Sequence, residues 1–153
     1  MDRIDKKILF LLQKDASLPV SEIANEVGLS TTPCWRRIQN LEKSGVIDKR
    51  VTLLDRDSLN ISIDVFVAIK TREHTAKWFN TFAEAVTEFP EVVEFYRMSG
   101  DIDYLMRVVV PDIRSYDEFY KRLIERVELE DVSSSFAMER LKYTTELPLD
   151  YVE

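Results

Sequence analysis

Residues 30–43 predict a helix with one face made of basic and hydrogen-bonding side chains. At about 100° per residue, one stripe of this helix is apolar, and the opposite stripe carries hydroxyl, amide, guanidinium and ammonium groups without a carboxylate. The apolar stripe is Cys34, Ile38 and Leu41, and the polar stripe is Thr32, Arg36, Gln39, Asn40 and Lys43. Such side chains read base edges and bind phosphate in a major groove. A solvated face usually mixes both charge signs, so the pattern favours nucleic acid.

The ends of this helix are also marked in the sequence. Ser30 suits the N-cap, because its hydroxyl can accept a backbone N–H of the first turn. Pro33 falls in that turn, where a missing N–H costs little, and Gly45 allows a left-handed exit. Residues 21–27 predict a shorter helix, separated from the first by Gly28. Two helices across a short glycine-containing turn are a helix-turn-helix, whose second helix enters the groove.

These helices belong to a three-helix head. Residues 2–14 form an amphipathic pattern in which Leu9 and Phe10 widen the apolar surface, to overfill a small core or to contact a second subunit. Residues 46–54 alternate enough for a strand or a short wing, where Lys49 and Arg50 either touch phosphate or do nothing. We expect double-stranded DNA to be bound by Ser30, Thr31, Thr32, Trp35, Arg36, Arg37, Gln39, Asn40 and Lys43.

The charge of the chain is divided unequally along its length. The net charge is −7 over 153 residues. Residues 1–56 hold 10 Lys/Arg and 8 Asp/Glu, a net of +2, whereas residues 57–153 have a net of −9. A weakly basic head on an acidic body fits one domain that touches phosphate and one that does not. The small surplus predicts modest affinity per protomer and a need for several copies.

The cysteine count and the distribution of apolar residues indicate the cellular compartment of the protein. One cysteine excludes a disulfide within the chain, which fits a reducing cytoplasm. No apolar run approaches a membrane span, and the N-terminal residues lack a signal-peptide pattern. We therefore expect a cytoplasmic protein without membrane contact.

The second half predicts an α+β domain. Period-two alternation and helical spacing give the order β-α-β-β-α-β, which is the ferredoxin-like unit. The expected elements are residues 61–70, 75–89, 92–98, 104–110, 113–127 and 132–143. Such a sheet carries helices on one face only, and its bare face predicts homodimerisation. The expected domains are residues 1–54, a linker at 55–60, and residues 61–153.

The residues give little support to an enzyme. His74 is the single histidine, and no Ser or Cys nucleophile lies near it in a catalytic pattern. Cys34 falls on the inner stripe of its helix, where it behaves as a small apolar residue. No ligand spacing for a metal and no phosphate-binding glycine loop is present. Asp101 and Asp103 lack a supporting group for acid–base catalysis. The acidic sheet without an aromatic RNA-binding pattern argues against RNA. We expect no catalytic residues, no metal site and no cofactor.

Several motifs in order resemble the leucine-responsive/asparagine-regulator (Lrp/AsnC) family of bacterial transcription factors over nearly the whole chain. The most specific pieces are IDKKIL at 4–9, VGLS at 27–30 continuing through PCWRR at 33–37, GVI at 45–47 and SGDIDYL at 99–105. The resemblance implies a winged helix-turn-helix, with DNA bound by about residues 20–39, and a C-terminal effector-sensing (RAM) domain. It also implies homodimers that assemble further, commonly to octamers.

In that family an amino acid effector is bound at a dimer–dimer contact. The resemblance places it against Met98, Ser99, Gly100, Asp101, Asp103, Tyr104, Ser135, Phe136 and Ala137. Asp101 and Asp103 suit the ammonium, and backbone N–H groups at Gly100 suit the carboxylate. Two alternatives stay open: the carboxylates solvate a hairpin tip, and Met98, Tyr104 and Phe136 belong to the sheet core.

The identity of the effector is less constrained. The Pro33-Cys34-Trp35 variant looks like the part of the family that answers to leucine or to sulfur amino acids such as cysteine. The alternative function is an effector-independent, DNA-organising protein of the nucleoid type.

Overall fold

The computed structural model describes residues 1–73 and 75–153, which form two compact units. The first unit combines Met1–Leu53 with Leu141–Glu153, and the second is Leu54–Arg140. His74, considered above as a catalytic candidate, lies outside the described residues. Within the described ranges, none of the helices has the length and apolar character to span a bilayer.

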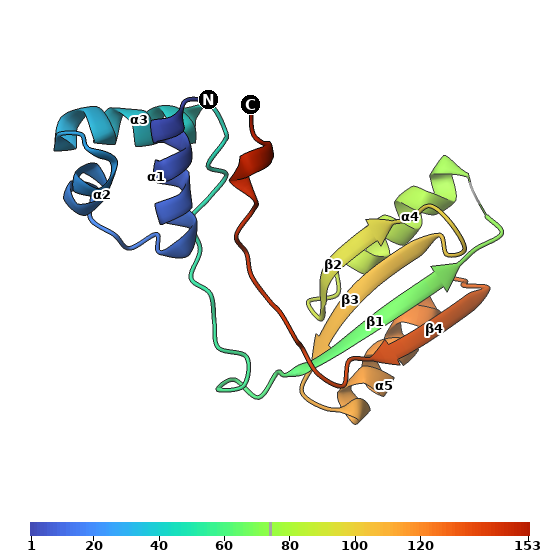
Figure 1. Ribbon diagram of the computed structural model, residues 1–153. Helices are drawn as coiled ribbons and strands as arrows, with labels where there is room; N and C mark the ends of the chain where they lie inside the picture. Colours follow the sequence, from blue (N-terminus) through green and yellow to red (C-terminus); the bar gives the residue numbers. More distant parts are fainter. Residues whose placement is uncertain (74) are drawn as a thin grey trace. The chain divides into compact units, whose positions relative to one another are not determined.

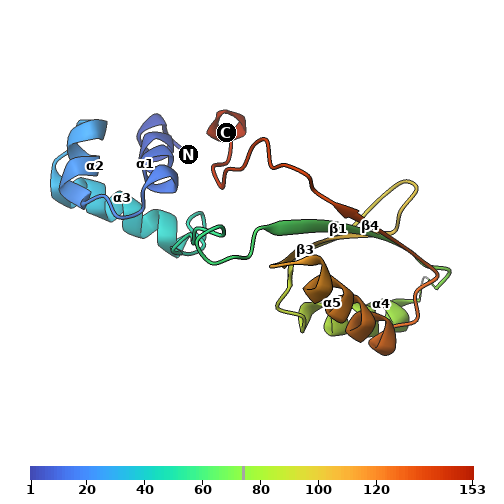
Figure 2. The same ribbon diagram turned by 90° about the horizontal axis from the view of Figure 1, so that it is seen from below.

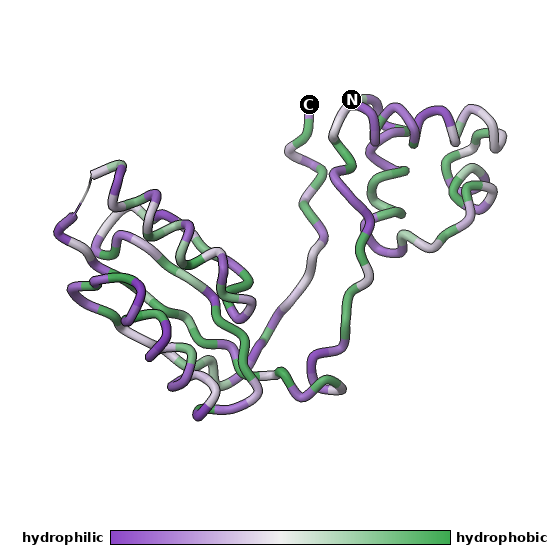
Figure 3. Tube along the Cα trace, turned by 180° about the vertical axis from the view of Figure 1, so that it is seen from behind, coloured by the Kyte–Doolittle hydropathy of each residue, from purple (hydrophilic) through white to green (hydrophobic). Residues whose placement is uncertain are grey.

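Three helices form the head of the first unit: α1 (Arg3–Lys14), α2 (Val20–Val27) and α3 (Thr31–Lys43) (Figure 1). The predicted three-helix head is confirmed. Its core consists of the inner stripes of the helices: Ile8, Leu12, Ile23, Ala24, Cys34, Ile38 and Leu41. Figure 3 shows the alternation of hydrophobic and hydrophilic residues along the helices that produces these stripes. Phe10 is 45% exposed, so it does not overfill this core.

The turn between α2 and α3 depends on a glycine. Gly28 caps α2 with φ 74°, a left-handed conformation that costs glycine no steric strain. Ser30 occupies the N-cap of α3 in an extended conformation, but its hydroxyl makes no capping hydrogen bond within the described chain. The expected role of the Ser30 side chain as a cap was therefore wrong, although the helix begins where predicted.

Residues 46–54, expected as a strand or a short wing, form no strand. These residues have no regular secondary structure, and from Asp48 to Leu54 their backbone forms no hydrogen bond with another backbone group among the described residues. A strand needs a neighbouring strand to pair with, and α3 is followed by none in this unit. Val51, Leu53 and Leu54 are exposed in this segment.

The last residues of the chain, expected in the sensor domain, are grouped with the first unit by their contacts. Gln13 on α1 donates through Nε2 to the carbonyl of Leu147 at 3.1 Å, and the Leu147 N–H donates to Gln13 Oε1 at 3.0 Å. Lys6 donates to the carbonyl of Val152. A short 3-10 helix, η1 (Leu149–Tyr151), lies between these contacts. Backbone hydrogen bonds to α1 side chains therefore group this segment with the head.

The second unit is a four-stranded antiparallel sheet with two helices. Its order along the chain is β1 (Ile63–Lys70), α4 (Ala76–Thr87), β2 (Val92–Arg97), β3 (Tyr104–Val110), α5 (Ile113–Arg126) and β4 (Asp131–Phe136). The strand order is β2-β3-β1-β4, with every neighbour antiparallel. Figure 2 shows both helices on one face of the sheet. The predicted ferredoxin-like α+β arrangement is confirmed, but the last strand ends at Phe136, opposite Val65, and is shorter than expected.

Alternation along β1 separates the two faces of this sheet. Val65, Val67 and Ile69 are fully buried under the helices with Phe82, Phe119 and Leu123. Asp64, Phe66 and Ala68 alternate with them and so lie on the other face, which we call the open face. Phe66 is 40% exposed there.

Candidate functional sites

Most of the predicted DNA-contacting side chains lie on the surface of α3. The exposed residues are Ser30, Thr31, Thr32, Trp35, Arg36, Asn40 and Lys43. Cys34, Ile38 and Leu41 of the same helix are buried, so the helix presents one polar face to solvent. That face carries a guanidinium, an amide, an ammonium and hydroxyls at positions one turn apart, which suits a groove lined by base edges and phosphates.

Arg37 has a different environment from its neighbour Arg36. Its Nη1 donates to Asp2 at 2.5 Å and to Asp5 at 2.8 Å, at the start of α1. These carboxylates raise the pKa of Arg37. In turn, the hydrogen bond from the Asp5 backbone N–H, followed by the one from Arg37, lowers the pKa of Asp2. Arg37 therefore holds α3 against α1, and its Nη1 is occupied by two carboxylates of the protein.

A carboxylate also lies beside the polar face, contrary to the sequence expectation. Gln39 donates through Nε2 to Glu42 Oε2 at 2.8 Å, and Arg50 donates to Glu42 Oε1 at 3.0 Å. Gln39 is half-buried in this arrangement. One of the two Nε2 hydrogens of Gln39 is therefore occupied by Glu42. The spacing of Gln39 and Glu42, three residues apart on a helix, was the signal available in the sequence.

The single cysteine packs in the core of the head. Cys34 is 0% exposed, and its burial raises the pKa of the thiol, while Arg37 lowers it by a smaller amount. The thiol is therefore kept protonated and packs as a small apolar group. Across the described residues, no group of three His, Cys, Asp or Glu is arranged to hold a metal ion.

The candidate effector hairpin is a tight turn with one anchored carboxylate. The Met98 N–H donates to the Asp103 carbonyl at 2.8 Å, and Gly100 has φ 110° at the tip, a conformation that other residues rarely adopt. Ser99, Gly100 and Asp101 are exposed. Asp103 donates its N–H to the Ile69 carbonyl at 2.9 Å. Its Oδ2 accepts the Thr71 N–H, also at 2.9 Å. Asp103 therefore fastens the hairpin to the end of β1.

The aromatic residues proposed for this site differ in their burial. Tyr104 is 5% exposed, and its ring packs against Phe79, Phe82, Phe95 and Trp78. The structure thus settles the open alternative for Tyr104, which belongs to the sheet core. Phe136 is 37% exposed and packs edge-on against Tyr116 with 5.2 Å between ring centroids. Met98 is 38% exposed beside the hairpin.

The two parts of the candidate effector site lie at opposite ends of the sheet in one chain. Ile69 of β1 pairs with Tyr104 and with Val132, whereas Val65 pairs with Phe136. Four residues along a strand span roughly 13 Å. Ser135, Phe136 and Ala137 therefore do not meet the hairpin of the same chain, and a shared pocket requires a second copy.

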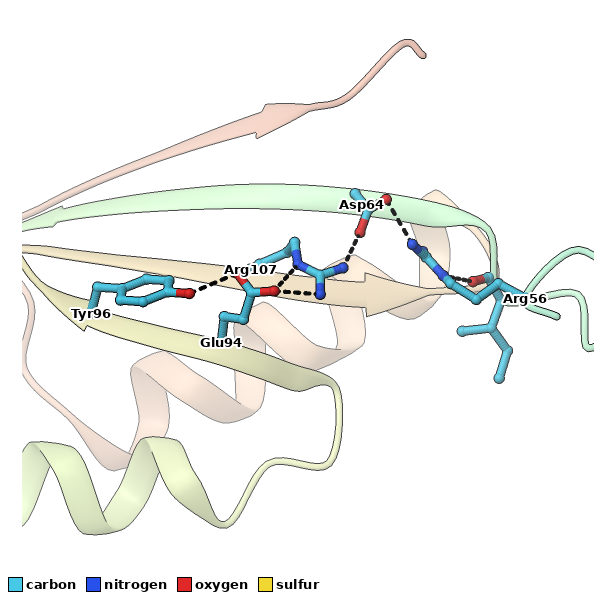
Figure 4. A network of polar contacts seen from close by, with 6 residues as sticks. Arg56, Asp64, Glu94, Tyr96 and Arg107 are labelled. Atoms are coloured by element: carbon cyan, nitrogen blue, oxygen red, sulfur yellow. Dashed lines mark hydrogen bonds and ion pairs between the residues drawn. The ribbon is translucent and has the colours of Figure 1, made fainter. Parts of the chain in front are cut away.

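Charged side chains form a network on the open face that was not predicted from the sequence (Figure 4). Arg107 donates to Glu94 at 2.6 Å and to Asp64 at 2.9 Å, and Arg56 donates to Asp64 at 2.8 Å. Burial raises the pKa of Asp64, but the hydrogen bonds from Arg56 and Arg107 outweigh it, so the pKa lies below its usual value. Arg107, Asp64 and Glu94 stand among apolar strand residues, which was the signal in the sequence.

Comparison with known proteins identifies both units. Residues 64–147 match the family model described as the Lrp/AsnC ligand binding domain, and residues 1–48 match that of a winged helix-turn-helix DNA-binding domain. The DNA-binding transcriptional activator DecR of Escherichia coli (strain K12) is 50% identical over 98% of this chain and 99% of its own length.

Two solved structures are similar over the whole chain. The crystal structure of an AsnC family transcriptional regulator from Agrobacterium tumefaciens has a TM-score of 0.98 and 63% identity, and covers 100% of both chains. The transcriptional regulator NMB0573 from Neisseria meningitidis, solved as a complex with L-Met, has a TM-score of 0.94 and 31% identity, covering 100% of this chain and 99% of its own.

Proposed function

The chain belongs to the Lrp/AsnC family of DNA-binding transcriptional regulators, and from this premise we propose that it binds double-stranded DNA sequence-specifically through α3 and senses a small amino acid. The observation that carries the first part is the exposed face of α3 with Arg36, Asn40 and Lys43, following the glycine break at Gly28. Arg36 and Asn40 are the candidate base readers, because their side chains form bidentate hydrogen bonds. Thr31, Thr32 and Lys43 are candidates for phosphate contact.

The proposed effector is a small amino acid bound at the hairpin tip. Asp101 supplies a carboxylate for the ammonium, and backbone N–H groups around Gly100 suit a carboxylate. Leucine and sulfur amino acids such as cysteine are the first candidates. The complex of the Neisseria meningitidis relative with L-Met supports the amino acid class. Ser135, Phe136 and Ala137 complete this site only when they come from another copy of the chain.

The proposed assembly is a homodimer that associates into a higher oligomer, an octamer being the first candidate. The open face supports dimerisation, because Phe66 and Tyr96 leave apolar surface exposed there, 40% and 50% respectively. Assembly into several copies would also compensate for the weak DNA affinity expected from the small positive charge of one head, because linked heads bind neighbouring sites with higher avidity. We propose that this assembly acts in the cytoplasm on chromosomal DNA.

A selection experiment tests this function directly. Binding sites are selected from a random double-stranded DNA library, and the affinity of the full chain is measured by fluorescence anisotropy for a selected and a scrambled duplex. The selected duplex is expected to bind at least tenfold more tightly. Equal affinities over a range of salt concentrations indicate phosphate contact alone and contradict sequence-specific binding.

The same measurement separates a sensor from a DNA-organising protein. Anisotropy on the selected duplex and sedimentation of the free protein are repeated with each of the twenty amino acids. We expect at least one to shift the affinity or the oligomer distribution severalfold. If none does so at millimolar concentration, the chain is an effector-independent DNA-organising protein.

A further inference from the structure

The charged network on the open face ends on the segment that leads to the DNA-binding unit. From β2, Glu94 binds Arg107 of β3, which binds Asp64 of β1, which binds Arg56. Figure 4 shows these residues as one continuous row. Arg56 precedes β1 and is close in sequence to Leu54, where the second unit begins. The row thus connects the sheet with the start of the chain's passage to the other unit.

Residues 55–61, which we call the linker loop, are folded rather than extended. The N–H of Ile61 donates to the Arg56 carbonyl at 2.9 Å, and the N–H of Asn60 donates to the Asp57 carbonyl at 3.0 Å. Arg56 closes the loop from outside by donating through Nε to the Ile61 carbonyl at 3.0 Å. The Arg56 side chain therefore binds its own loop and β1 at the same time.

Asp64 accepts hydrogen bonds from residues near both points where the chain passes between the units. Its carboxylate accepts from Arg56 at 2.8 Å, before β1, and its backbone carbonyl accepts the Ala137 N–H at 2.9 Å, just after β4. The chain passes between the units after Leu53 and again after Arg140. Residues close to both crossings are thus fixed to a single residue of the sheet.

The carboxylate of Asp64 is shared between two competing donors. Arg107 Nη1 occupies Oδ1 at 2.9 Å, and Arg56 Nη1 occupies Oδ2. Arg56 Nη2 is buried and has no hydrogen-bond partner among the described residues. A buried unpaired donor costs free energy, which a bidentate arrangement with both carboxylate oxygens would remove. In the observed arrangement Arg107 holds Oδ1 on its own side, and Arg56 Nη2 reaches neither oxygen.

We propose that this network is a two-position coupling device, in which withdrawal of Arg107 from Asp64 lets Arg56 bind both carboxylate oxygens and tighten the linker loop. A cavity of about 270 Å³ lined by Arg56, Asp64 and residues 137–140 gives the guanidinium room to turn. Arg107 lies on the open face, where the proposed contact with a second copy would act on it. The device rests on the proposed function, because it carries the state of the sensor assembly to the DNA-binding unit.

Hydrogen exchange of the linker-loop amides distinguishes this device from a purely structural network. The variant Arg56→Gln is expected to speed exchange at Asn60 and Ile61 at least tenfold. Arg107→Met is expected to slow it at least threefold, because Asp64 then accepts Arg56 alone. The control Arg72→Gln removes the Arg72–Glu130 ion pair, which lies outside the network, and is expected to leave these amides unchanged. Faster exchange in Arg107→Met overturns the proposal.

DNA affinity supplies the second readout. On the selected duplex, Arg56→Gln and Arg107→Met are expected to change the affinity at least threefold in opposite directions, with Arg72→Gln as reference. Equal affinities in all three overturn the coupling. If Arg107→Met loses its fold by circular dichroism, Arg107→Leu replaces it, since a side chain without a donor also releases Asp64 and must give the same sign. Failure of the wild type to bind selected DNA contradicts the proposed function, while the opposite signs of exchange test the device alone.

Discussion

Arg37 of α3 donates to the Asp5 carboxylate of α1 at 2.8 Å, whereas Arg36, its neighbour in sequence, is exposed to solvent. Two adjacent arginines therefore have separate tasks in the recognition helix. Arg37 fixes the orientation of α3 on α1, and Arg36 is presented on the polar face. Under the proposed function, Arg37 would set the orientation of α3 and Arg36 would form part of its reading surface.

Replacing each arginine by alanine is expected to separate these tasks. Arg36→Ala is expected to weaken binding to the selected duplex by about 1–3 kcal/mol and to leave the free energy of unfolding unchanged. Arg37→Ala is expected to lower the unfolding free energy by up to about 1 kcal/mol, because its partly exposed ion pairs are screened by solvent. Anisotropy and urea unfolding measure the two effects. Normal DNA affinity in Arg36→Ala would remove it from the reading surface.

The two carboxylates of the effector hairpin are expected to respond differently to substitution. Asp101→Ala is expected to reduce the heat of amino acid binding at least tenfold and leave the unfolding midpoint unchanged, since Asp101 is exposed at the tip. Asp103→Ala is expected to destabilise the domain by about 1–2 kcal/mol, because the Thr71 N–H loses its acceptor. Calorimetric titration and thermal unfolding of both variants check this. Wild-type binding heats in Asp101→Ala would contradict its assignment.

The open face is expected to be sensitive to a new charge. Phe66→Arg places a guanidinium in the proposed contact between two sheets, and is expected to weaken dimerisation at least a hundredfold. Ile113→Arg is the matched control, because Ile113 is 68% exposed on α5, on the side of the sheet that the helices cover. Sedimentation velocity measures both. A dimer of Phe66→Arg as tight as that of Ile113→Arg would place the interface elsewhere.

The second unit is expected to lose stability in acid through Asp64. Its folded pKa lies below the unfolded value, which is about 3.9, so the ionised carboxylate stabilises the fold at neutral pH. That contribution is lost as the pH falls from about 4 through the folded pKa. Urea unfolding at pH 7 and pH 3.5 checks this.

Asp64→Asn is the variant that isolates this contribution. It is expected to cost roughly 2 kcal/mol at pH 7, below the range for a fully buried pair because both arginines are partly exposed. It should also reduce the loss between pH 7 and pH 3.5. If Asp64→Asn loses as much unfolding free energy between pH 7 and pH 3.5 as the wild type, the loss belongs to other carboxylates.

Much of the fold followed from local patterns in the sequence. Strict alternation around Val65 and Val67 predicted a strand with one buried face, and helical spacing around Phe119 and Leu123 predicted α5; both residue sets are buried. These predictions succeeded because burial of one face imposes a period of two or 3.6 on the residues themselves. Gly28 and Gly45 likewise marked turns that require a left-handed backbone.

Contacts between distant residues could not be predicted in this way. Arg37 forms ion pairs with Asp2 and Asp5, and Asp103 accepts a hydrogen bond from Thr71. These contacts depend on which elements meet in space. The grouping of Leu147 with α1 depends on a side-chain amide that binds a backbone far along the chain. A single sequence carries no periodic signal for such pairs. For this reason the exposed polar face of α3 was predictable, while the ion pairs and hydrogen bonds of Arg37 and Asp103 were not.

The burial of Cys34 has a consequence for how a sulfur compound would influence this regulator. Thiol–disulfide exchange begins with attack by a thiolate on an accessible sulfur. The side chain of Cys34 is 0% exposed and its pKa is raised, so neither condition is met in the folded head. Disulfide exchange with cystine therefore has no route through Cys34 while the head stays folded, and we expect a response to cystine to arise from reversible binding elsewhere.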